Sequence, residues 1–179
     1  MKNLLKYIHG ENPTPRDFFL VHVLPFMLAG FYRFYHADIF QHWSFIQMLL
    51  YYVFASELIG GFFANLSVST KLFWATQPLK NKFIFVFLHA WQPIAWFLFF
   101  KCDVRFGFAI FIYAAVSTII LLKISDKLLL PLSLLFTFIG IYFSTYLSNH
   151  FNFMPYGLEW VPIAYFLKLI FAFTIKYKN

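Results

Sequence analysis

Six long apolar runs, separated by short polar breaks, constrain the fold of this chain more than any other feature. Of its 179 residues, 61% are hydrophobic and 12% are charged, whereas about a quarter of the residues in a soluble domain are charged. A membrane-spanning helix needs about 20 mostly apolar residues. The runs therefore predict an all-α fold, a polytopic membrane helix bundle formed by one integral membrane domain (residues 1–179), with six transmembrane helices near 17–35, 43–66, 83–100, 105–122, 128–148 and 158–175.

The basic residues predict the orientation of these helices. Lys and Arg are concentrated in the N-terminal segment, the second and fourth loops and the C-terminus, and the opposite side holds only Arg33, Lys101 and Arg105. Because cytoplasmic loops carry the excess of Lys and Arg, both termini are expected in the cytoplasm. This placement requires an even number of spans, in agreement with the six predicted helices. The expected location is a bacterial plasma membrane, with an organellar inner membrane as the alternative.

The composition also excludes several classes of function. The net charge is +7, but no basic stretch carries the interleaved aromatic residues typical of nucleic-acid binding. The expected partners are the lipid bilayer and, in one interpretation, other membrane subunits. A single cysteine, Cys102, rules out an intrachain disulfide and a Cys-based metal site within the chain. No motif identifies a cofactor.

Four ionisable residues interrupt the apolar runs, on four different predicted helices: His22, Glu57, His89 and Lys168. At a rise of about 1.5 Å per residue, all four fall at comparable depth in the cytoplasmic half of the membrane. Ionisable residues at such depth are costly, usually face the bundle interior and mark functional sites. The sequence therefore predicts a buried polar site formed by Glu57 and His89.

Helical spacing indicates which other residues share the predicted site. Glu57, Gly61 and Asn65 recur every four residues, and Gln92 follows His89 by three, so each set lies on one face of a continuous helix. The predicted ligand-binding groups around Glu57 and His89 are His22, Asn65, Gln92 and Lys168.

Several chemistries fit these groups. Glu57 and a neutral histidine suit a proton relay or solute site, because histidine titrates near neutral pH. Alternatively, His22, Glu57 and His89 supply the two imidazoles and one carboxylate of a catalytic metal site, or His22 and His89 are the axial ligands of a haem. An ion pair between Glu57 and Lys168 that only fixes helix packing is the purely structural alternative.

Two short segments resemble a known family. SELIGGF (residues 56–62) and FVFLH (residues 85–89) resemble the glutamate and Phe-xxx-His motifs of the CAAX-protease and bacteriocin-processing intramembrane peptidases. The resemblance implies that Glu57 and His89 activate a water molecule. The chain departs from the family pattern at Ser56, which replaces the first glutamate, and at Gly61, which replaces an arginine, and it has only SNHFN in place of the later His-xxx-Asn motif.

Three functions are open at this point. The leading hypothesis is binding and translocation of a small solute or proton, with Glu57 changing protonation and His89 relaying the proton. The second is a membrane-embedded enzyme, hydrolytic or metal-dependent, that acts on lipid or peptide. The third is a structural subunit of a larger membrane complex.

Overall fold

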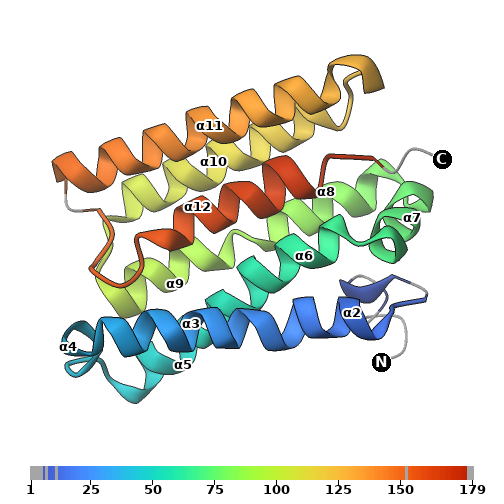
Figure 1. Ribbon diagram of the computed structural model, residues 1–179. Coiled ribbons are helices and arrows are strands. Elements are labelled where there is room, and N and C mark those ends of the chain that lie inside the picture. Colours follow the sequence, from blue (N-terminus) through green and yellow to red (C-terminus); the bar gives the residue numbers. More distant parts are fainter. Residues whose placement is uncertain (1–5, 7, 11, 152, 177–179) are drawn as a thin grey trace.

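The structure, a computed structural model, is an all-α bundle and describes residues 6, 8–10, 12–151 and 153–176 (Figure 1). Five of its helices are long and apolar enough to cross a membrane: Pro15–Tyr35, Phe45–Leu66, Leu79–Phe100, Val104–Leu121 and Asp126–Phe151. They confirm that the chain is a polytopic membrane protein and correspond to the first five predicted spans. The sixth predicted span, 158–175, is represented by a shorter apolar helix, Trp160–Ala172.

The first two long helices form an antiparallel pair. The first begins at a capping box, in which the Thr14 hydroxyl accepts from the Asp17 amide and the Asp17 carboxylate accepts from the Thr14 amide, with Pro15 at the first helical position; this pairing satisfies free amides of the first turn. The elements of the pair are α2 (Pro15–Phe18), η1 (Phe19–Val23), α3 (Leu24–Tyr35), α4 (Ala37–Phe40), α5 (Phe45–Phe54), η2 (Ala55–Gly60) and α6 (Gly61–Leu66).

Glycine sets how closely this pair approaches. A Cβ atom built on Gly60 would lie 2.3 Å from the Val21 carbonyl oxygen, so only glycine lets η2 lie against η1 at this point. Near the opposite end of the pair, the buried Tyr51 hydroxyl donates a 2.8 Å hydrogen bond to the Ala29 carbonyl. Close approach through small residues is the usual way in which membrane helices pack.

The middle of the chain contains a broken helix. A short helix, α7 (Val68–Thr76), is followed by α8 (Leu79–Leu88) and α9 (Trp91–Phe100), which are separated by a turn at His89 and Ala90. After a turn at Lys101, whose φ is 58°, the chain continues into two long neighbouring helices, α10 (Val104–Leu121) and α11 (Asp126–Phe151).

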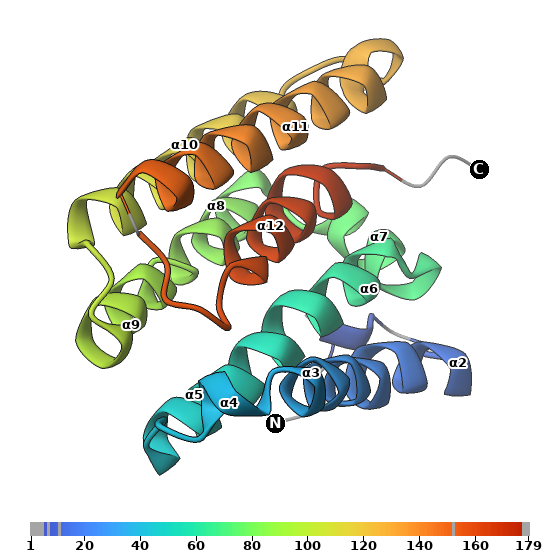
Figure 2. The same cartoon turned by 60° about the vertical axis from the view of Figure 1, so that its left-hand side comes forward.

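The last helix occupies the centre of the bundle. It consists of α12 (Trp160–Phe166) and the π-helical turn η3 (Leu167–Ala172). Figure 2 shows α12 between the α10–α11 pair and the α3 and α5–α6 pair. Tyr165, Leu169 and Ile170 are each 0% exposed, so this helix packs against other helices over most of its surface, and Ile163, Leu167 and Phe171 form a partly exposed stripe.

Candidate functional site

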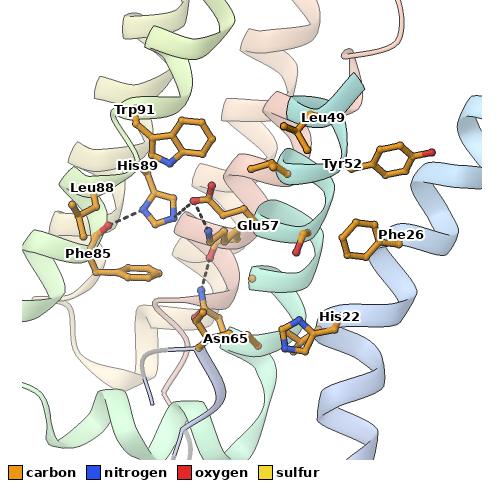
Figure 3. A pocket seen from close by; sticks show the side chains of 17 residues that line it. His22, Phe26, Leu49, Tyr52, Glu57, Asn65, Phe85, Leu88, His89 and Trp91 are labelled. Atoms are coloured by element: carbon orange, nitrogen blue, oxygen red, sulfur yellow. Dashed lines mark hydrogen bonds and ion pairs between the residues drawn. The ribbon is translucent and has the colours of Figure 1, made fainter. Parts of the chain in front are cut away.

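Glu57 belongs to a π-helical turn. It lies in η2, between the regular helices α5 and α6. Such turns widen a helix by one residue and occur frequently at functional sites. The Glu57 side chain is 29% exposed and lines a cavity, which Figure 3 shows with its lining side chains.

His89 lies at the break between α8 and α9, and Pro93 explains the break. Proline has no N–H for the carbonyl four residues earlier, and its ring crowds that carbonyl. The freed His89 carbonyl instead accepts from the Gln92 amide at 3.2 Å and from the Tyr165 hydroxyl at 3.4 Å. The chain therefore leaves the α-helix at His89 and holds this residue in a fixed turn against the central helix.

The His89 ring is oriented by a single hydrogen bond. Its Nδ1–H donates to the Phe85 carbonyl at 2.7 Å, which assigns the proton of the neutral ring to Nδ1. Nε2 therefore points toward Glu57, 3.6 Å from Oε1, and accepts no hydrogen bond from any side chain that the structure describes. The imidazole is 4% exposed.

Lys168 supplies the opposite charge from the central helix. It lies in the π-helical turn η3, and its Nζ is 3.4 Å from the same Glu57 oxygen. The Lys168 side chain is only 4% exposed and packs against Gly61, where an added Cβ would lie 2.6 Å from Cε. Asn65 donates from Nδ2 to the Lys168 carbonyl at 3.4 Å. Glu57 thus forms an ion pair with Lys168 from the central helix and lies beside the neutral His89 ring from a third helix. The pairing with Lys168 balances the carboxylate charge at this depth.

The cavity beside these groups has a volume of about 650 Å³, which lies within the range of small-molecule sites. Its walls are mostly apolar, and several of their side chains are exposed on the outside of the bundle, including Phe26, Leu49 and Leu88. The polar side chains in the lining are His22, Tyr52, Ser56, Glu57, Asn65, His89 and Lys168. The site is therefore a mostly apolar cavity with an ion pair, Glu57 and Lys168, in its wall.

The structure places the remaining predicted residues as follows. His22 lines the cavity from η1, but its Nε2 is 2.8 Å from Nε2 of His9, so its hydrogen-bond partner is a residue outside the predicted site. Asn65 lines the cavity, whereas Gln92 is fully buried elsewhere and neither of its amide atoms has a hydrogen bond within the described chain. Within the same residues, no three His, Cys, Asp or Glu side chains gather closely enough to hold a metal ion. Metal and haem ligation stay predictions.

Sequence reasoning missed three contributors to the site. His9 was overlooked because it precedes the first apolar run, and Phe85 contributes a backbone carbonyl, which its residue type cannot reveal. Tyr165 lies in the last apolar run and reaches the His89 backbone. The position of Pro93 could have predicted the contact with Tyr165. A proline four residues after His89 leaves the His89 carbonyl free to accept a hydrogen bond from another helix.

No protein-family model, curated protein or solved structure matches this chain. The resemblance to the intramembrane peptidases is therefore limited to the two short segments, residues 56–62 and 85–89.

Proposed function

We propose that the protein binds a small solute in the cavity beside Glu57 and moves it together with a proton, which Glu57 and His89 exchange. The observation that supports this function is the geometry of one carboxylate. Glu57 is partly exposed to a 650 Å³ cavity, and one of its oxygens faces both His89 Nε2 and Lys168 Nζ.

Each group has a distinct role in this proposal. Lys168 is buried and stabilises the ionised form of Glu57, so that the site tolerates a carboxylate inside the membrane. His89 keeps one proton on Nδ1, bound to the Phe85 carbonyl, and therefore accepts a second proton only at Nε2, beside Glu57. A proton delivered from the cavity can thus reside on either group, and the bound solute decides which one holds it.

A second function is favoured by the rim of the cavity. Exposed apolar side chains such as Phe26 and Leu88 surround it, so that a lipid-dissolved molecule can enter from the side. In an enzyme, His89 would be a general base oriented by a backbone carbonyl, a recognised arrangement in catalysis. Hydrolysis of lipid or peptide is therefore the alternative, and Glu57 would then activate water.

We also infer that the helix Trp160–Ala172 completes a sixth crossing and that both termini lie in the cytoplasm. Two observations support this topology. The beginning of α2 and the end of η3 lie at the same end of the bundle (Figure 1). The segments that hold Lys71, Lys80 and Lys123 are α7, the start of α8 and the turn between α10 and α11, and they lie at that end too (Figure 1). This agrees with the excess of basic residues expected on the cytoplasmic side of a bacterial plasma membrane.

The proposed function is tested by Glu57→Gln in proteoliposomes that contain a trapped pH-sensitive dye. Glutamine keeps the size of the side chain and removes its ability to carry the proton. We expect proton flux above that of empty liposomes for the native protein and a loss of about a hundredfold in the variant, in line with the contribution of a positioned proton-transfer group.

Asp103→Asn is the matched control, because this carboxylate lies in the turn between α9 and α10, where it caps α10 and pairs with Arg105. Native flux in the Glu57→Gln protein would contradict the proposal, as would a native protein that conducts no protons. Turnover of a lipid or peptide ester that disappears in the same variant would favour the enzyme instead.

A further inference from the structure

A second cavity, with a volume of about 210 Å³, lies on the far side of Asn65 from the Glu57 site. Asn65 lines both cavities. The elements that surround the second cavity all begin or end there: α6 ends at Leu66, α8 begins at Leu79, and η3 ends at Ala172. It therefore lies at one end of the bundle, at the level where a membrane protein meets the lipid headgroups.

Three lysines line this cavity, and two of them have no counter-ion among the residues that the structure describes. Lys176 binds the Asp126 carboxylate at 2.7 Å. Lys71 from α7 and Lys82 from α8 are half-buried, and neither forms an ion pair with any carboxylate in the described part of the chain. The cavity therefore carries an excess positive charge.

Burial makes this excess charge costly. Desolvation lowers the pKa of Lys71, because its ammonium group has lost water without gaining an opposite charge. The back of the cavity is closed by Trp74 and Phe173, which are 5% and 8% exposed and whose rings pack edge to face. Two partly desolvated ammonium groups against an apolar wall are an arrangement that an anion would stabilise.

We propose that this cavity binds a phosphate group through Lys71 and Lys82. The volume fits a small anionic group and not a whole lipid or nucleotide. Lysine binds phosphate as a point charge from its flexible side chain, and basic residues beside a membrane attract anionic lipids. The phosphate belongs either to the headgroup of a membrane phospholipid or to a free phosphorylated compound, and the experiment separates these two sources.

The test uses the full-length protein and two probes. In the first arm, the protein in nanodiscs of phosphatidylcholine with a minor fraction of phosphatidylglycerol is analysed by native mass spectrometry for retained anionic lipid. In the second arm, inorganic phosphate is titrated calorimetrically into the protein in a zwitterionic detergent. We expect Lys71→Gln and Lys82→Gln each to weaken binding at least about tenfold, because a hydrogen bond to a charged group is lost.

Two further variants make the result specific. Lys80→Gln removes the same charge from an exposed position on α8 outside this cavity, and we expect it to leave binding within about twofold, the behaviour of an exposed charge. Lys71→Arg keeps the positive charge and retains binding, which separates a lost contact from a misfolded protein. Binding in the lipid arm alone identifies a headgroup site, and binding in the phosphate arm alone identifies a site for a free phosphorylated compound.

If neither probe binds, the proposal is overturned. An equal loss of binding affinity in Lys80→Gln overturns it as well. The outcome is independent of proton transfer at Glu57. Glu57→Gln is expected to retain anion binding, and Lys71→Gln is expected to retain proton flux, so failure of one proposal is distinguishable from failure of the other.

Discussion

At the scale of single residues, a carboxylate inside an apolar helix is accounted for by its neighbours. Lys168 and His89 approach the same oxygen of Glu57 from different helices. The sequence predicted these three residues because ionisable groups stand out in apolar runs. It could not predict that they meet while the His22 ring pairs with His9, because this depends on which helices are neighbours.

The fit of Lys168 against Gly61 gives a prediction at this scale. In Gly61→Ala the added methyl would lie 2.6 Å from Lys168 Cε, so the end of the lysine side chain must shift, which disturbs its ion pair with Glu57. We expect destabilisation by about 1 kcal/mol, at the low end of overpacking because a flexible side chain can adjust, and reduced proton flux. Thermal unfolding in detergent measures the first effect.

Gly30→Ala is the control for this prediction, because a Cβ atom at Gly30 meets nothing within 4 Å. The control is expected to be neutral or slightly stabilising, since alanine restricts the unfolded chain more than glycine does. Equal stability of the two variants would show that Lys168 has no fixed place beside Gly61.

At the scale of elements, the site is built where helices depart from regular α geometry. His22, Glu57 and Lys168 each lie in a π-helical turn, and His89 lies in the break before α9. The spacing rule held within the second long helix, where Glu57, Gly61 and Asn65 all line the cavity. It failed for Gln92, because the turn at His89 interrupts the 3.6-residue period on which the predicted face depended.

The turn between α9 and α10 makes a prediction about pH. Burial raises the pKa of Cys102 to about 12, and the thiolate is the form that reacts with maleimides. The protonated thiol should therefore dominate from neutral pH to about pH 10. The alkylation rate of a free thiol levels off above about pH 8.5, whereas the rate at Cys102 should keep rising with pH. Mass spectrometry of the native protein treated with N-ethylmaleimide measures this rate.

The matched control carries Cys102→Ser together with Lys101→Cys, which moves the thiol to an exposed neighbouring position. The relocated thiol should react at least tenfold faster at pH 7. One pKa unit, about 1.4 kcal/mol, changes the thiolate fraction tenfold, and burial raises the pKa of Cys102 by more than one unit. Equal rates at the two positions would show that the Cys102 thiol is not protected in the folded protein.

At the scale of the whole molecule, the central helix explains where the sequence was least informative. An apolar run of 18 residues predicts a span but not its surroundings, and here Trp160–Ala172 packs mostly against other helices and is shorter than the predicted 158–175. A helix that packs mostly against protein has less contact with lipid, so lipid thickness alone does not set its length. The turn that precedes this helix contains Gly157, with a φ of 97°, and ends at Glu159.

The number of crossings decides on which side the C-terminus lies. With six crossings, peptide tags on the two termini lie on the same side of the membrane, and with five they lie on opposite sides. Because basic residues favour the cytoplasm for both ends, we expect both tags to resist added protease in intact spheroplasts and to be digested after permeabilisation. A tag inserted in the turn after α9, beside Lys101, is the control and should be digested in intact cells. Digestion of the C-terminal tag alone, of the two terminal tags, would establish five crossings and would contradict the position of Lys176 beside Lys71 and Lys82.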